Sequence, residues 1–225
     1  MDAGSGVRSG RRKGDRCKIK EGSGLSALSS RVRCVEMATM EESKVKEMIK
    51  LLDEAVKIQE EKGCCQAVKQ ALEDIVRSGD DFLDPIFLKP ADGKYARRLV
   101  HKDPQDRYSV LAMVWDKGQG TSLHDHAGHW CVECVYRGRI QVVSYSLQGD
   151  VESETIQFQR ETEIMAGPGE AGALIPPFEY HTICNPDDTP AVTIHVYAGE
   201  LDHCYIFTPV EGGFRRELKE LTYTA

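Results

Sequence analysis

Two histidines separated by a single residue are the groups in this chain with the clearest chemical potential. His124 and His126 precede a hydrophobic run that ends at Gly138. Residues i and i+2 of an extended strand project to the same side, so these two imidazoles could bind one metal ion. Imidazole suits zinc, copper, iron and nickel, and a third histidine would complete one face of the coordination sphere. His181 is the best candidate for that third ligand.

A second group of polar side chains alternates along an apolar run. Thr193, His195 and Tyr197 are each separated by one aliphatic residue, so all three should face one side of a strand. A hydroxyl, an imidazole and a phenol on one face can form a hydrogen-bonded relay. The pattern therefore predicts a relay directed into a site.

The spacing around the two histidines resembles the first motif of the cupin superfamily, which runs here from Gly118 to Gly138. The motif usually carries a metal-binding Glu where this chain has Cys131. That replacement is similar to animal-type cysteine dioxygenase, in which a cysteine stands there and three histidines hold the metal. The second cupin motif is matched in part, by Pro176, His181 and Asn185.

Two further segments favour the thiol dioxygenase family over a generic cupin. Tyr95 and Arg97 resemble the family's Tyr-x-Arg, whose arginine holds the substrate carboxylate, and the Thr193 to Tyr197 segment is similar to its Ser-x-His-x-Tyr. A planar guanidinium can bind a carboxylate through two parallel hydrogen bonds. Arg98 is the competing candidate, because strand alternation lets only one of the pair face the site. An exposed basic pair on a loop is the alternative interpretation.

The resemblance implies a mononuclear Fe(II) enzyme with His124, His126 and His181 as ligands. It would oxidise L-cysteine with O2 to cysteine sulfinate, and a thioether would join Cys131 to Tyr197. The crosslink stays open, because many bacterial relatives have Gly at this position and Tyr197-Ala-Gly-Glu200 looks bacterial. Two alternatives are a 3-mercaptopropionate dioxygenase and a non-catalytic cupin that binds a metal or ligand.

Composition limits the partners. The 225 residues carry a net charge of -7, which argues against nucleic acid as a partner. No apolar stretch is long enough to span a membrane, and no secretion signal is recognisable, so we expect a cytoplasmic protein. Residues 1–35 hold nine Lys/Arg against three Asp/Glu, and we expect residues 1–38 to be a disordered basic extension or, alternatively, an organellar transit peptide. The expected partners are a small thiol and O2, and the expected state is a monomer.

Periodicity predicts helices followed by strands. Apolar spacing predicts helices within about residues 40–88, the first reaching about Glu61 and ending at Gly63. Short β-prone runs follow at 108–115, 130–136, 139–147, 155–159, 172–175 and 191–198. The chain is therefore predicted to be mainly β, with N-terminal helices and one cupin domain over residues 39–225. Its jelly-roll (double-stranded β-helix) barrel is expected over about 95–210. His101, His129 and His203 are not expected to bind the metal.

Overall fold

The computed structural model describes residues 44–79 and 81–225. The predictions for residues 1–38 lie outside this part of the chain. The described part of the first helix covers residues 44–55, and the remaining elements follow in the order α2 Glu61–Arg77, the 3-10 helix η1 Pro85–Leu88, β1 Ala96–Lys102, β2 Tyr108–Trp115, β3 Leu123–His124, β4 Cys131–Arg137, β5 Ile140–Gln148, β6 Gln157–Ala166, β7 Ala171–Leu174, β8 His181–Cys184, β9 Ala191–Ala198, β10 His203–Val210 and β11 Gly213–Glu220.

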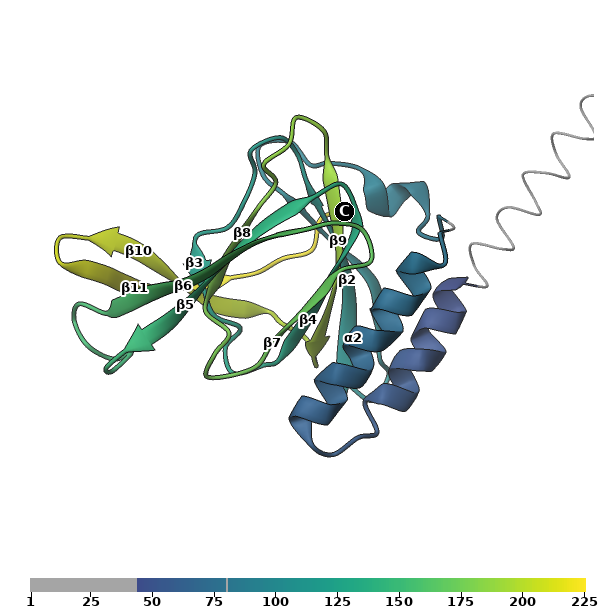
Figure 1. Cartoon of the computed structure of the whole chain (residues 1–225), viewed down its shortest axis with the longest axis horizontal. Coiled ribbons are helices and arrows are strands. Elements are labelled where there is room, and N and C mark those ends of the chain that lie inside the picture. Colours follow the sequence, from purple (N-terminus) through teal and green to yellow (C-terminus); the bar gives the residue numbers. More distant parts are fainter. Residues whose placement is uncertain (1–43, 80) are drawn as a thin grey trace, which may run out of the picture. The chain divides into compact units, whose positions relative to one another are not determined.

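The strands form two antiparallel sheets. One sheet has the order β1-β2-β9-β4-β7 and the other β11-β10-β3-β8-β5-β6. From β2 to β10 the chain passes repeatedly from one sheet to the other, which is the winding of a jelly roll. In Figure 1 the helices lie beside the sheet that contains β2 and β9. The prediction of a mainly β jelly-roll barrel with N-terminal helices is confirmed.

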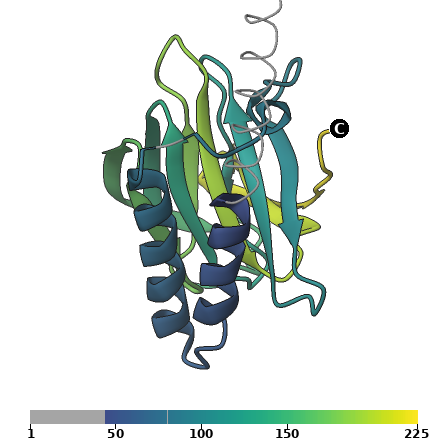
Figure 2. The same cartoon turned by 90° about the vertical axis from the view of Figure 1, so that its right-hand side faces the viewer.

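The helices cover the outer face of the five-stranded sheet (Figure 2). Met48 and Leu52 of the first helix and Leu72 of α2 are fully buried in one cluster with the sheet. The predicted end of the first helix at Gly63 is wrong, because this helix ends near residue 55 and Gly63 lies in the first turn of α2. The Glu60 carboxylate caps α2 by accepting the Gly63 backbone N–H at 2.6 Å.

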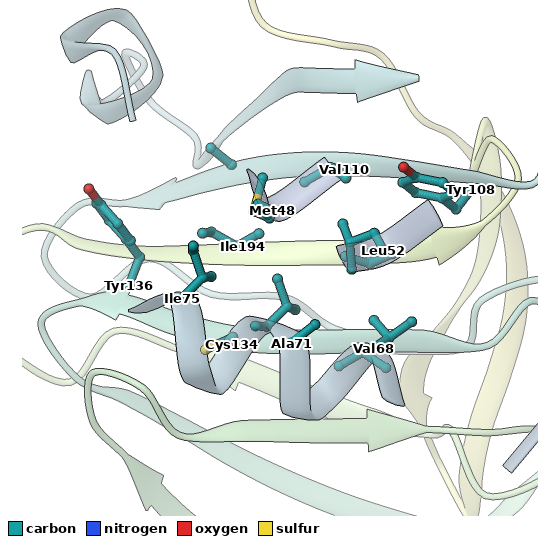
Figure 3. Close-up of a cluster of buried hydrophobic side chains, with 14 of the residues drawn as sticks. Met48, Leu52, Val68, Ala71, Ile75, Tyr108, Val110, Cys134, Tyr136 and Ile194 are labelled. Atoms are coloured by element: carbon teal, nitrogen blue, oxygen red, sulfur yellow. The ribbon is translucent and has the colours of Figure 1, made fainter. Parts of the chain in front are cut away.

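Strict alternation along β9 separates two environments. Val192, Ile194 and Val196 face the helices, as Figure 3 shows for Ile194. Thr193, His195 and Tyr197 therefore face the interior between the sheets. Every residue of β2 is buried, because helices cover one face of the strand and the barrel interior the other. The interior face of this sheet carries the polar side chains.

Several strands were not predicted from the sequence. They are β1, β3, β8, β10 and β11. β3 and β8 have two and four residues, too few for a repeat to be visible, and they are defined by pairing between His124 and His181. β10 and β11 form a hairpin with many half-buried or exposed positions, so their hydrophobic pattern is weak.

The six cysteines within residues 44–79 and 81–225 are free thiols. Cys131 and Cys134 are three residues apart on β4 and join different buried clusters, Cys131 beside Tyr197 and Cys134 beneath the helices (Figure 3). Strand alternation thus keeps the two thiols apart. Among the helices of the described part, none is both long and apolar enough to cross a bilayer.

Candidate metal centre and substrate pocket

Three histidines from different segments converge in the barrel interior. His124 on β3 pairs directly with His181 on β8, and His126 follows β3 in a loop. One nitrogen from each ring lies within 4.8 Å of the other two, and His126 and His181 are each only 1% exposed. His126 is thus brought to the cluster by a loop and not by the strand geometry assumed from the sequence.

The loop that carries His126 is fixed by Asp125, whose role was not predicted. The Asp125 carboxylate accepts the backbone N–H groups of Ala127 at 3.1 Å and Tyr205 at 2.8 Å. Ala127 adopts a positive φ of 51° in the turn that follows His126. At the outer ends of the motif, Gly118 and Gly138 also have positive φ, a conformation that glycine adopts without strain.

The chemistry of the three rings fits a divalent metal ion. Nδ1 of His124 lies 3.0 Å from the Ser122 carbonyl oxygen and Nδ1 of His181 lies 2.8 Å from that of Glu179. A carbonyl only accepts, so each Nδ1 carries the proton and leaves Nε2 with a free lone pair. Burial lowers the pKa of all three histidines, and the neutral imidazole is the form that binds metals. Nδ1 of His126 is buried without a hydrogen-bond partner among the described residues.

The predicted relay lies along β9, and pairing with β4 brings Cys131 beside it. Cys131 lies opposite Tyr197 in the register. The Thr193 hydroxyl lies 2.7 Å from Nε2 of His195, and the Tyr197 hydroxyl lies 3.3 Å from Nδ1 of the same ring. Cys131 Sγ is 3.9 Å from that Nδ1. The hydroxyl groups of Thr193 and Tyr197 therefore each contact one nitrogen of His195, and the Cys131 thiol lies beside this chain of contacts.

Burial sets the ionisation of this group. It lowers the pKa of His195 to about 3, and it raises the pKa values of Tyr197 and Cys131 well above their usual values. In the protein without a metal, the imidazole, the phenol and the thiol are consequently all neutral at pH 7.

Arg97 lies on β1 with its guanidinium toward the same interior. The side chain is 5% exposed and donates to the carbonyl oxygens of Leu201 at 3.1 Å and Thr222 at 3.4 Å. These two bonds leave part of the guanidinium's five N–H donors for a ligand. Arg98 donates to the carbonyl of Lys89, away from the pocket. The alternative of an exposed basic pair on a loop is wrong, because both arginines are buried on a strand.

Tyr95 completes this wall of the pocket. Its ring lies 4.7 Å from that of Trp115, and burial raises the pKa of its hydroxyl. A small cavity of about 30 Å³ lies between Arg97 and the histidines. It is lined by Tyr95, Arg97, Met113, Trp115, Thr121, His124, His126, His181, Ile183, His195, Tyr197, Leu201, Cys204 and Leu221.

Some of these lining residues were not predicted from the sequence. Met113 and Trp115 alternate on the interior face of β2, so strand periodicity could have identified them. No local sequence pattern identifies Leu201, Cys204 or Leu221 as lining residues. His101, His129 and His203 lie outside the three-histidine cluster, as expected. His129 instead contacts the carbonyl of Ala198.

The sequence also matches known proteins. A family model described as cysteine dioxygenase type I matches residues 64–209. Cysteine dioxygenase type 1 of Bos taurus and of Homo sapiens are each 23% identical over 123 residues, and that of Rattus norvegicus is 24% identical. Each match covers 54% of this chain and 60% of the relative, so the chain spans about three fifths of the length of these relatives.

Solved structures with similar folds were also found. A Cupin 2 conserved barrel domain protein from Salinispora arenicola is 18% identical, with a TM-score of 0.36, over 52% of this chain and 86% of that one. Oxalate oxidase in complex with the substrate analogue glycolate is 19% identical, with a TM-score of 0.38, over 54% and 62%.

Proposed function

The chain belongs to the cysteine dioxygenase type I family, and we propose that it is a mononuclear non-haem Fe(II) thiol dioxygenase that oxidises L-cysteine with O2 to cysteine sulfinate. The observation that carries the proposal is the shared cavity. Three histidines, a guanidinium and two relay residues, His195 and Tyr197, all border one small space, and Thr193 contacts His195 from behind. A metal site alone would not require the arginine or the relay.

His124, His126 and His181 are the proposed ligands. Three neutral imidazoles leave an iron ion its full positive charge and open positions, where it would bind and deprotonate the substrate thiol and take up O2. The chain's own task is to hold the three rings neutral and fixed, which the Ser122 and Glu179 carbonyls do for two of them. Zinc and nickel cupins usually have a metal-binding Glu at the position in the first cupin motif where this chain has Cys131.

The proposed preference for L-cysteine depends on Arg97. Its fixed guanidinium can bind the carboxylate of L-cysteine and so place the thiol toward the histidines. 3-Mercaptopropionate has the same two groups and is the alternative substrate, although relatives that use it often have Gln at this position. Tyr95 and Trp115 also line this pocket.

Tyr197 is proposed to act on the reacting atoms through its hydroxyl, with His195 and Thr193 behind it. The phenol proton is retained at neutral pH because burial raises the Tyr197 pKa. It is therefore available to donate a hydrogen bond or a proton to oxygen in the cavity. A non-catalytic cupin that binds only a metal or a ligand would have no use for this relay.

The first test is oxygen uptake. We expect the purified, iron-loaded protein to consume O2 with L-cysteine and to form cysteine sulfinate, identified by mass spectrometry, with weaker uptake for 3-mercaptopropionate and cysteamine. A preference for 3-mercaptopropionate would support thiol dioxygenation but would replace L-cysteine as the proposed substrate. Bound iron with no thiol-dependent uptake would support the non-catalytic cupin instead.

A Cys131–Tyr197 thioether is proposed as a modification of the same site. The two residues are direct partners across β4 and β9, so the sulfur can reach the phenol ring without moving the backbone. Bond formation removes the thiol hydrogen and one ring hydrogen, and O2, the proposed co-substrate, accepts the two electrons. We expect intact-mass analysis after turnover to show the loss of two hydrogens, and peptide mapping to link the two residues. Free Cys131 in active protein would contradict the crosslink, and a Cys131→Ser variant should never show the mass change.

The basic segment 1–38, a cytosolic location and a monomeric state stay predictions. The same holds for the boundaries of the single domain over residues 39–225.

A further inference from the structure

The residues that follow β11 lie beside β1 at the wall of the substrate pocket. The Arg97 backbone N–H donates to the Thr224 hydroxyl oxygen at 3.0 Å, and the Thr224 N–H donates to the Arg97 carbonyl at 2.6 Å. The Leu221 N–H donates to the Asp202 carbonyl at 2.7 Å, and the Leu221 side chain lines the pocket. Residues 221–225, the strap, are therefore held to the barrel by backbone hydrogen bonds.

The strap also contacts the Arg97 side chain. The guanidinium donates to the Thr222 carbonyl at 3.4 Å, and its Cζ atom lies 5.7 Å from the centre of the Tyr223 ring. A cation at this distance over an aromatic face is attracted by the ring. Together with the Leu201 carbonyl, these two groups restrain a long side chain that would otherwise sample many rotamers. Two of the three groups belong to the strap.

Tyr223 is itself anchored by Glu200, the last residue of the Tyr197-Ala-Gly-Glu200 segment. The Tyr223 hydroxyl donates to Glu200 Oε1 at 2.8 Å, and Glu200 also pairs with Lys102. Burial raises the pKa of Tyr223 to about 12, whereas hydrogen bonds from Lys102 and Tyr223 lower the pKa of Glu200. At neutral pH a protonated phenol therefore donates to a carboxylate, which is a charge-assisted hydrogen bond.

Free space beside Arg97 gives this anchoring a consequence. A cavity of about 120 Å³ adjoins the pocket that contains the three histidines, and Tyr95, Arg97 and Leu221 line both. Thr222 and Thr224 of the strap also border this outer cavity. A guanidinium released from the strap has room to turn toward the outer cavity and away from the histidines. The strap contacts therefore decide on which side the guanidinium lies.

We propose that Tyr223 is a positioning residue that holds the Arg97 guanidinium in the inner pocket for the substrate carboxylate, and that Glu200 fixes Tyr223. This inference rests on the proposed dioxygenase function and deepens it. Tyr223 is not among the described residues that line the inner pocket, so it acts on the substrate through Arg97. Its loss should weaken carboxylate binding and leave the reaction of the thiol at the histidines unchanged.

The first test compares two thiols in the iron-loaded protein. Tyr223→Ala should raise KM for L-cysteine roughly 10-fold, because it removes both the ring and its hydrogen bond, while kcat stays unchanged. KM for cysteamine, which has no carboxylate, should not change. When Arg97 is already alanine, adding Tyr223→Ala should raise KM no further. A wild-type KM for L-cysteine in Tyr223→Ala, or an equal rise with cysteamine, would overturn the proposal.

Conservative variants separate the ring from its anchor. Tyr223→Phe keeps the ring, and Glu200→Gln keeps an oxygen that can accept from the Tyr223 hydroxyl. Tyr223→Phe and Glu200→Ala should each raise KM for L-cysteine roughly 3-fold, and Glu200→Gln should keep the wild-type KM, since losing the exposed Lys102 pair has little effect. The matched control is Leu218→Ala, at an exposed position on β11, which should not change KM. A wild-type KM in Glu200→Ala would show that Glu200 does not fix Tyr223.

The position of the guanidinium can also be measured without turnover. In protein loaded with Zn²⁺ as a diamagnetic probe, ¹⁵N NMR should show a distinct Arg97 Nε–H signal, identified with an Arg97→Lys variant. In Tyr223→Ala this signal should move to the averaged position of mobile arginine side chains, while that of Arg98 stays in place. An unchanged Arg97 signal would overturn the inference. A shifted signal in a protein that oxidises no thiol would retain the positioning of Arg97 and reject the dioxygenase function instead.

Discussion

Replacing His126 with alanine is expected to abolish iron binding and thiol-dependent oxygen uptake together. The ring is 1% exposed and its Nδ1 has no hydrogen-bond partner among the described residues. Without it, two imidazoles remain, too few to hold an exchangeable divalent ion tightly. Activity should fall well beyond the roughly 100-fold that follows loss of an outer partner of a metal ligand. Metal analysis by mass spectrometry, paired with an oxygen electrode, measures both effects.

The matched control is His129→Asn, three residues further along. His129 lies outside the cluster, and the amide of asparagine can still donate to the Ala198 carbonyl that His129 contacts. We expect this variant to keep its iron and its activity. Full iron occupancy in His126→Ala, or equal iron loss in both variants, would contradict the assignment of His126 as a ligand.

Replacing Arg97 with alanine should reduce kcat/KM for L-cysteine by roughly 100-fold or more, mainly through KM. The guanidinium is buried and fixed, and a charge-assisted bond pair to a carboxylate contributes about 3 kcal/mol. Cysteamine lacks the carboxylate, so its kcat/KM should hardly change in the variant. Comparing the two thiols thus separates the loss of carboxylate binding from general damage to the site.

The adjacent Arg98 provides the control. It is equally buried but donates to the Lys89 carbonyl on the other side of β1. We expect Arg98→Lys to keep the wild-type KM for L-cysteine, whatever its effect on stability. An unchanged KM for L-cysteine in Arg97→Ala, or equal losses with cysteine and cysteamine, would show that Arg97 does not bind the substrate carboxylate.

Local periodicity accounts for much of what could be predicted. The predicted run 191–198 coincides with β9, and its alternation alone is enough to put Thr193, His195 and Tyr197 on one face. The same rule lets only one of Arg97 and Arg98 face the site, and the family resemblance chose Arg97, although β1 itself was not predicted. Both inferences have one physical basis: the direction of a side chain along a strand depends on the residue's own backbone and its neighbours.

Other features could not be read from local patterns. β3 and β8 are too short to carry a periodic signal and exist because they pair with each other. The first helix ends before the predicted glycine because Glu60 begins a new helix there. Tertiary pairing decides the first outcome and local capping by Glu60 the second, and hydrophobic periodicity reports neither.

The sequence by itself determined the kinds of groups present and the face on which each lies: an imidazole pair, a relay and a guanidinium. Only the tertiary structure decided which groups meet. It placed His181 beside His124, and it placed Glu133, which no sequence motif singles out, opposite His195. The reason is physical: strand register is set by the burial of whole sheets against each other, so residues distant in sequence become neighbours only when the barrel closes.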